Sequence, residues 1–461
     1  MKSEHDRDET KKNLYSMDMC HGSILPKLLA YTLPLLCSGI LQLLFNAADV
    51  VVVGRYCGEN SMAAVGSTTS LINLLTNLFL GLSIGSNVLV AKNFGANKKN
   101  HVQKVVHTSM ALSGICGLVL TIFGLLFAKQ ILIWMKTPAA VLPLAVLYLR
   151  VYFIGISAVM IYNFGNAILR AVGDTKRPLY SLLFSGIINV LLNLFFVVVC
   201  HMDVAGVGLA TVISECISAF LIVRCLMKEK ECYQFVLKKL RMTPVFLWQI
   251  LRIGIPAGIY GTVFSLSNVV IQSSVNSFGA TVMAGNAAAM NLEGFVYMAM
   301  NSFSQAAVSF TGQNFGAGHI KRIGKIACYS LVCVFLTGLL MGQGVYFFGD
   351  ELLSIYSDKK SVIEAGILRM SYICRTYFFC GMMDVMVGLL RGLGRSVLPT
   401  VVSMIGACGL RLLWIFTIFR IPAYHNPGML YFSYPMSWTI TFLVHLLCFG
   451  ILYKKLRKEE I

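Results

Sequence analysis

The sequence predicts an all-α integral membrane protein of twelve transmembrane helices in two pseudo-symmetric six-helix lobes. Three observations lead to this prediction. Of the 461 residues, 57% are hydrophobic and only 13% are charged. Apolar runs of membrane-spanning length recur along the whole chain, and the second half repeats motifs of the first. A chain this apolar would not dissolve as a globule, so most of its surface is expected to face lipid.

Twelve apolar runs are long enough to cross a bilayer as helices, for which about 20 residues suffice. They cover residues 28–54, 64–90, 105–127, 144–169, 179–200, 204–227, 253–275, 284–310, 326–348, 367–390, 397–419 and 433–452. The longest connection is the basic stretch Lys228–Arg241, between the sixth and seventh runs. We therefore expect an amino-terminal tail (1–23), a first lobe (24–227), a linker (228–246), a second lobe (247–453) and a basic tail (454–461).

The net charge of +18 is explained by topology. Most lysines and arginines lie in the two tails and in the even-numbered loops, which places both termini in the cytoplasm of a multi-pass protein of the cell (inner) membrane. We expect no nucleic-acid partner. The 14 cysteines are scattered, most of them inside apolar runs and with no CxxC pair, so no disulfide or metal framework is predicted. No phosphate-binding loop occurs, and we expect no cofactor.

The chain repeats itself. Asn93 and Gly95 in AKNFGANKK return as Asn314 and Gly316 in GQNFGAGHIKR, 221 residues later. LRAVGDTKRP returns as LRGLGRSVLP at the same offset, and Pro34 in the first run is answered by a proline in the seventh. Since six is an even number, both lobes keep the same orientation, and in transporters such halves rock against each other around a central site.

These motifs resemble those of the multidrug and toxic compound extrusion (MATE) family over residues 25–452. The resemblance is carried by Pro34 with NAADVVVVGR, the two NFGA loops, LRAVGDTKRP, the INVLLN of the fifth run and the GLATVISE of the sixth. It implies a secondary active antiporter that exports small amphipathic, often cationic organic compounds. The resemblance further implies that export is driven by the inward flow of protons or sodium ions.

The first run carries Asp49 in its second half. A carboxylate at membrane depth is costly and is a functional hypothesis by default. Pro34 removes a backbone hydrogen bond earlier in the same run, so we expect a hinge there. The family resemblance makes Asp49 an ion-coupling carboxylate with Asn189, Asn193 and Thr211 as partners. Relatives often have an aspartate at the place of Asn193, so this lobe has one negative charge fewer. The alternative for Asp49 is a buried carboxylate satisfied by backbone donors or an arginine.

The second lobe has a candidate in the tenth run. The resemblance places Asp384 where several relatives couple ions or bind substrate. The alternative is a salt bridge of Asp384 with Arg375 or Arg411, which also lie at membrane depth. Some relatives complete this site with a glutamate in the seventh run. Here that run offers only Asn268 and Gln272, which we place in the substrate cavity.

Glu293 in the eighth run is the candidate for selecting cations. Asn291 and Tyr297 lie near it in the sequence, and an anionic group among aromatic and Met side chains would attract lipophilic cations. The alternative is a core glutamate whose charge is already satisfied. Glu215 in the sixth run is a weaker candidate of the same kind. His107 and His445 could relay protons, but lone histidines near helix ends are more often structural, and we expect a structural role.

We therefore expect an alternating-access antiporter that works as a monomer in the lipid bilayer. The proton is expected as the coupling ion rather than sodium, because burial alone can favour protonation of a single carboxylate, whereas sodium needs more negative charge. A flippase for lipid-linked precursors is the alternative, but such proteins tend to have a cationic cavity. Neither a channel filter nor a hydrolase constellation appears, so an enzyme is not expected.

Overall fold

The computed structural model describes residues 16–459, and within that range every element is a helix. The α-helices are α1 (Ile24–Tyr56), α2 (Glu59–Gly95), α3 (Lys99–Trp134), α4 (Leu142–Ala171), α5 (Lys176–Leu194), α6 (Asp203–Lys228), α7 (Pro244–Asn276), α8 (Ala280–Gly316), α9 (Ile320–Phe347), α10 (Gly349–Ser354), α11 (Lys360–Ile373), α12 (Phe378–Gly392), α13 (Val397–Ser403), α14 (Leu410–Phe416) and α15 (Pro427–Glu459). Short 3-10 or π segments join or extend them: η1 (Phe195–Val199), η2 (Leu237–Lys239), η3 (Cys374–Thr376), η4 (Met404–Gly409), η5 (Ile418–Arg420) and η6 (Pro422–Tyr424).

The helices match the predicted spans with two differences. Within residues 16–459, ten helices are long and apolar enough to cross a membrane. The tenth predicted run is not one straight helix: α11 and α12 form it together, bent by 45° at η3. The eighth run is α8, which has 37 residues and is long enough to cross a membrane. It is not among the ten helices because its many Asn, Gln, Ser and Thr side chains make it less apolar. Its polar residues are mostly buried against other helices, where lipid does not reach them.

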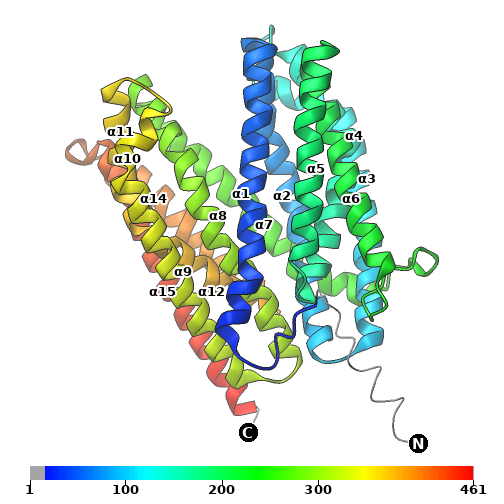
Figure 1. Ribbon diagram of the computed structural model, residues 1–461. Coiled ribbons are helices and arrows are strands. Elements are labelled where there is room, and N and C mark those ends of the chain that lie inside the picture. The colour runs from blue at the N-terminus through cyan, green and yellow to red at the C-terminus, as the bar shows by residue number, and fades with distance from the viewer. Residues whose placement is uncertain (1–15, 460–461) are drawn as a thin grey trace, which may run out of the picture.

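The helices form two groups that converge at one end of the molecule. Figure 1 shows α2–α6 in one group and α8–α15 in the other, with α1 and α7 between them. Both ends of the described chain lie at the convergent end, which we call the termini face, and the groups diverge toward the opposite face. The buried apolar side chains form two large clusters that largely follow this division.

Helices α1 and α7 each belong to both clusters. Leu28 and Tyr31 in the first part of α1 pack with the second-half cluster, whereas Val53 near its end packs with the first. The arrangement is reciprocal in α7, where Ile250 packs with the first-half cluster and Ile271 with the second. The first helix of each repeat therefore crosses from the partner half, at the termini face, into its own half.

The two NFGA loops pack against each other's helices. A methyl group in place of the hydrogen of Gly95 would overlap the carbonyl oxygen of Gln313, and one on Gly316 would overlap that of Lys92. Between these halves, backbone therefore lies directly on backbone at the termini face, which only glycine permits. The repeated NFGA motif therefore makes the same kind of contact twice, once from each half.

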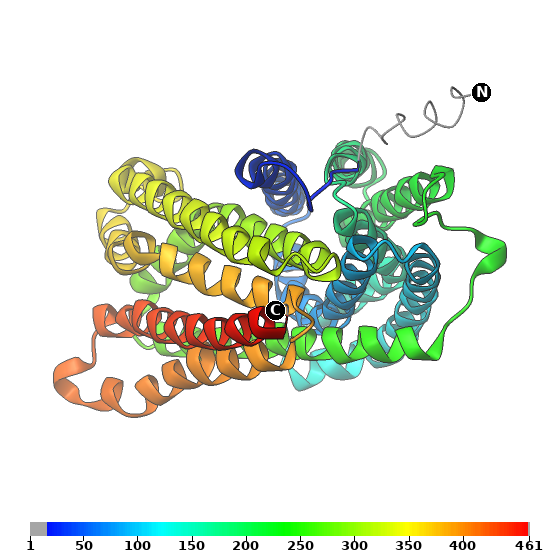
Figure 2. The ribbon, with the colours of Figure 1, turned by 90° about the horizontal axis from the view of Figure 1, so that it is seen from below.

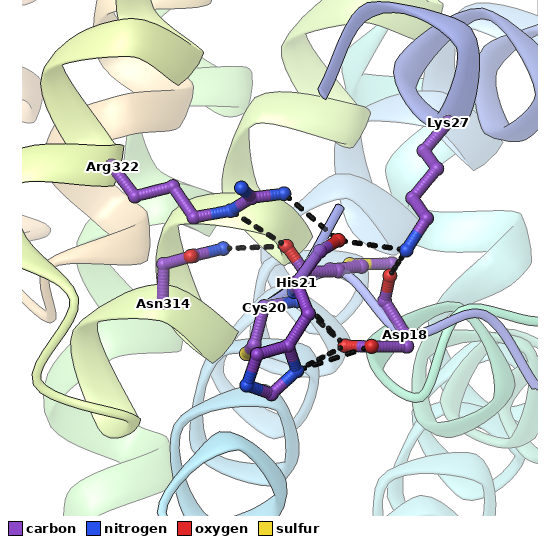
Figure 3. A network of polar contacts seen from close by, with 7 residues as sticks. Asp18, Cys20, His21, Lys27, Asn314 and Arg322 are labelled. Atoms are coloured by element: carbon purple, nitrogen blue, oxygen red, sulfur yellow. Dashed lines mark hydrogen bonds and ion pairs between the residues drawn. The ribbon is translucent and has the colours of Figure 1, made fainter. Parts of the chain in front are cut away.

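Residues 16–23 of the predicted amino-terminal tail pack against the protein, whereas residues 1–15 of that tail lie outside the described part of the chain. Figure 3 shows Asp18, Cys20 and His21 of the 16–23 segment between Lys27 on one side and Asn314 and Arg322 on the other. The Met19 side chain is fully buried, and its carbonyl oxygen accepts hydrogen bonds from Asn314 Nδ2 (3.0 Å) and Arg322 Nε (3.4 Å). Arg322 also donates to the carbonyl oxygen of His21 (3.1 Å), and so does Lys27 Nζ (2.8 Å). Residues 16–23 thus tie the start of α1 to the second half. At the other tail, α15 continues to Glu459.

Cys20 in this segment offers a way to detect its release. Burial and the neighbouring Asp18 raise the pKa of the Cys20 thiol to about 11, although Arg322 opposes the shift. We expect the double variant Asn314→Ala/Arg322→Gln to free the segment, restore an ordinary thiol pKa and speed maleimide labelling of Cys20 by at least about tenfold at neutral pH. Labelling would be measured by mass spectrometry of the Cys20 peptide, with Lys321→Gln as the control. If the segment stays bound, loss of the Arg322 charge would slow labelling instead.

Candidate functional site

The first-half candidates meet where α1, α5 and α6 face one another. Asn193 Nδ2 donates to the Asp49 carboxylate and also to Asn189 Oδ1 (3.2 Å), and Asn189 Nδ2 donates to Ser214 Oγ (3.4 Å). Asn189 and Asn193 are buried and four residues apart, so they lie on one face of α5. Asp49 is half-buried and forms no ion pair with any residue that the structure describes. Asp49 is therefore a carboxylate held by an amide and not by a cation.

Ser214 was not among the predicted partners of Asp49, but it is part of this cluster. The Thr211 hydroxyl donates to the carbonyl oxygen of Val207 (3.0 Å) in its own helix, so Ser214 and not Thr211 bonds directly to the asparagine pair. The buried Oδ1 atom of Asn193 accepts no hydrogen bond and remains a potential ligand for a cation. Ser214 lies in the quoted GLATVISE motif, but only its position one turn beyond Thr211 could have pointed to it.

Helix α1 positions Asp49 relative to the hinge. Pro34 lies inside α1 and is buried in the part of the helix nearer the termini face. Residues 36–51, which follow it, include no buried residue. The Tyr31 hydroxyl, one turn before Pro34, lies 2.9 Å from both the Arg170 carbonyl oxygen and Ser309 Oγ. The first part of α1 is therefore fixed at the termini face, while the part that carries Asp49 has no buried side chain between residues 36 and 51. The predicted hinge separates these two parts.

The second half holds a buried ion pair that the sequence analysis did not find. Arg369 donates from Nε to Glu293 Oε1 (2.9 Å) and from Nη2 to Oε2 (2.7 Å). Its Nη1 donates to Asn286 Oδ1 (2.8 Å), and Asn286 Nδ2 donates to Gln272 Oε1 (3.0 Å). Only 4% of Glu293 and 4% of Arg369 is exposed. The pair matches the alternative raised above, in which Glu293 is a core glutamate whose charge is satisfied. The role of Glu293 in selecting cations stays a prediction.

Asp384 has a different environment. Tyr297 is its hydrogen-bonding neighbour, and Ser304 Oγ donates to its carbonyl oxygen (2.7 Å). The alternative salt bridge with Arg375 or Arg411 is wrong, because no ion pair of Asp384 is formed within the described chain. Arg375 instead stacks on the Tyr346 ring, 5.3 Å from its centre.

Two buried arginines lie near Asp384 without a carboxylate partner in the described part of the chain. Arg411 is fully buried, donates to Ser437 Oγ (2.8 Å) and lies 4.4 Å from the centre of the Tyr434 ring. Arg391 lies against the Tyr260 ring (5.5 Å). The interior of the second half is therefore richer in positive charge than the candidate carboxylates suggested.

The other predicted candidates are placed as follows. Asn291 is exposed and Asn268 is half-buried, so neither belongs to the ion-pair network. Glu215 is half-buried on α6, four residues beyond Thr211 and one after Ser214. His445 lies 2.9 Å from Ser403 Oγ, a contact consistent with a structural role.

A polar seal joins the two halves at the termini face. Arg170 in α4 donates to the side-chain oxygen of Gln305 in α8. Gln313 Nε2 donates to the carbonyl oxygen of Ala171 (2.7 Å), and Ser309 Oγ donates to Asn87 Oδ1 (3.3 Å). With Tyr31, these bonds close the molecule on the side of the termini. Asp49 lies on the far side of this seal.

Comparisons with known proteins agree with this architecture. The MatE family model matches residues 34–195 and again residues 256–417, which confirms the internal duplication. "Probable multidrug resistance protein YoeA" of Bacillus subtilis (strain 168) is 26% identical over 432 residues, which cover 92% of this chain and 93% of that protein. "Probable multidrug resistance protein NorM" of Thermotoga maritima is 26% identical and covers 84% of each chain.

Solved structures show the same fold. The chain superposes with a TM-score of 0.90 on "Crystal structure of MATE in complex with MaL6", which is 20% identical and covers 95% of this chain and 98% of that one. The fold and its buried polar clusters define an all-α membrane transporter. The chain belongs to the MatE family of multidrug efflux transporters, whose members carry solutes across the cell membrane and are not enzymes.

Proposed function

We propose that this protein is an ion-coupled antiporter that exports small amphipathic organic compounds by alternating access. The observation that carries the proposal is Asp49, a carboxylate that forms no ion pair with a described residue and lies on a helix that packs with both halves. A group that must be neutralised by a bound cation can link ion binding to the position of its helix. Pro34 gives that helix a place to bend.

Ion binding would act through the bond between Asp49 and Asn193. An ionised Asp49 accepts the hydrogen bond from Asn193 Nδ2 strongly, since hydrogen bonds to charged acceptors are about twice as strong as neutral ones. Protonation weakens that bond and removes the charge. The part of α1 that carries Asp49 is then freer to shift relative to α5, while the part before Pro34 stays fixed by the Tyr31 hydroxyl.

We propose the proton as the coupling ion. Asp49 is the one carboxylate in the cluster, and its other members, Asn189, Asn193 and Ser214, supply only neutral ligands. Sodium binding needs several oxygen ligands and enough negative charge to offset dehydration, whereas one buried carboxylate suffices for a proton.

Proteoliposomes with separate gradients test this coupling. A proton gradient alone should drive transport of a fluorescent organic cation, and a sodium gradient alone should do little. Asn193→Asp places a second carboxylate beside Asp49, and such a pair binds a cation or shares a proton. We therefore expect this variant to gain a sodium response. Asn163→Asp is the control, because the Asn163 amide bonds to the Val159 carbonyl and not to Asp49. Full transport by the unchanged protein on sodium alone would overturn the assignment of the proton.

We propose that the termini face is cytoplasmic, on the basis of the lysines and arginines in its loops. The polar seal then closes the cytoplasmic side and Asp49 lies toward the exterior. Single-cysteine variants of a cysteine-free chain test this orientation. In whole cells, Lys359→Cys should react with an impermeant maleimide, whereas Lys98→Cys and Lys230→Cys should react only after the membrane is opened. The reverse pattern would contradict the orientation.

Two classes of substrate, which differ in charge, are candidates. Organic cations fit the lone carboxylate Asp49 and the names of the multidrug-resistance relatives. Anionic aromatic compounds fit the buried guanidinium groups of Arg391 and Arg411, which form no ion pair with a described residue, and one relative is named "FAD transporter". Transport assays with a cationic dye and with a flavin nucleotide, each driven by the same proton gradient, would separate the two classes.

A further inference from the structure

A basic hollow of about 340 Å³ opens on the termini face where α3 meets the linker that joins the halves. Lys104, Lys239 and Arg241 surround it, with His107 and Thr243 among the residues that line it. All three cationic side chains are exposed, and none forms an ion pair with a residue that the structure describes. The hollow therefore has several positive charges and no negative charge to balance them.

The linker is held against α3, so the hollow has a fixed floor. The Val236 backbone N–H donates to His107 Nε2 (3.1 Å), and Nδ1 of the same ring lies 2.7 Å from the Gln103 carbonyl oxygen. The Thr243 N–H donates to Thr108 Oγ1 (3.1 Å). Only 4% of His107 is exposed. In Figure 2 the linker runs along the outside of the first-half group before α7 begins.

Exposed apolar side chains lie within four residues in sequence of those that line the hollow. Leu237 is 62% exposed, Val245 63% and Trp248 67%. These residues belong to η2 of the linker and to the first turns of α7. Large apolar side chains beside Lys and Arg, with a Trp among them, are typical of the layer where lipid headgroups meet acyl chains. The hollow would thus lie at headgroup depth.

We propose that this hollow binds the phosphate headgroup of an anionic phospholipid from the leaflet at the termini face. Basic pockets on the cytoplasmic side of membrane proteins attract anionic headgroups, and each Lys or Arg adds to the attraction. The phosphate would lie among Lys104, Lys239 and Arg241, and the acyl chains would lie along Val245 and Trp248. This inference uses the proposed cytoplasmic orientation but not the coupling ion.

The bound lipid would fasten the linker to the first half. Lys104 belongs to α3, and Arg241 lies in the linker three residues before α7, whose start packs with the first-half cluster. A phosphate held by both would fix the linker while the halves rock. The second repeat offers no equal site, because the place of His107 is taken by Cys328, which is exposed. One lipid per chain is therefore expected.

Native mass spectrometry of the full-length purified protein tests the proposal. The chain is titrated with phosphatidylglycerol, with phosphatidylcholine of the same acyl chains, and with glycerol phosphate. We expect one phosphatidylglycerol to bind preferentially, with affinity that falls as salt rises. The triple variant Lys104→Gln/Lys239→Gln/Arg241→Gln should weaken that binding by roughly tenfold or more. Its control, Lys321→Gln/Lys325→Gln/Lys458→Gln, removes three exposed charges from the same face and should change it less than about twofold.

Three results would overturn the proposal. Equal losses in both triple variants would mean that the general charge of the face, and not this hollow, attracts lipid. Equal binding of phosphatidylcholine would show that the anionic charge is not recognised. Displacement of the lipid by glycerol phosphate at similar concentration would identify a soluble phosphate compound as the ligand. The last two measurements are made on the unchanged protein, so they hold even if the triple variant fails to fold.

Discussion

Asp49→Asn is expected to reduce gradient-driven export to background while leaving the protein folded and inserted. The amide keeps the size of the side chain but cannot bind a proton or balance a cation, so the link between the gradient and α1 is lost. Asn193 can still donate its hydrogen bond to the new amide oxygen. The measurement is export of a fluorescent substrate from proteoliposomes at matched protein content.

Asp358→Asn is the matched control, because Asp358 is an exposed carboxylate in the loop before α11. Its export should equal that of the unchanged protein. The decisive comparison is the pH dependence of substrate binding, which should be present in the unchanged protein and absent in Asp49→Asn. Export by Asp49→Asn at the rate of the unchanged protein would make Asp49 structural and remove the main support for the proposed coupling.

Glu293→Gln is expected to destabilise the second half strongly. The change leaves the Arg369 guanidinium buried without its counter-ion, and breaking a buried ion pair on one side costs about 3–5 kcal/mol. The double variant Glu293→Gln/Arg369→Gln removes both charges and should recover most of that loss. Thermal unfolding of the purified protein in detergent would measure both effects.

An exposed ion pair on the same helix as Arg369 provides the control. Lys360 and Glu364 lie on α11 with 4.0 Å between Nζ and Oε1, and both side chains are largely exposed. Glu364→Gln should therefore leave the melting temperature nearly unchanged. If Glu293→Gln were as stable as the unchanged protein and lost only the export of cations, then Glu293 would select substrates as the sequence suggested.

The sequence was sufficient to predict the architecture because the bilayer limits what a chain can do. A span must satisfy its own backbone hydrogen bonds, so about 20 apolar residues indicate a helix almost wherever they occur. The repeat of the NFGA loops then gave the arrangement of the halves. The bend at η3 was not predictable, because no proline marks it, and the packing of Met19 depends on residues in α8 and α9.

The candidate site was predicted less completely. Asp49 was found because a carboxylate is conspicuous inside an apolar run, and the family resemblance supplied Asn189 and Asn193 as its partners. The pairing of Glu293 with Arg369 was missed, since helices that are apolar on most sides give no periodic signal for which face meets which neighbour. The same difficulty led to the wrong ion pair for Asp384. Depth in the membrane can be read from sequence, but the rotation of a helix about its axis depends on packing.

The segment before α1 also constrains how the protein is made. Met19 emerges from the ribosome early, but its partner Asn314 follows 295 residues later. At about 5–20 residues per second, this corresponds to roughly 15–60 s of synthesis. For most of that time the buried face of Leu28 and Tyr31 has none of its second-half neighbours. The first half of the chain therefore cannot reach its final structure alone, and it depends on the translocation machinery or lipid to shield the start of α1 until α8 has been inserted.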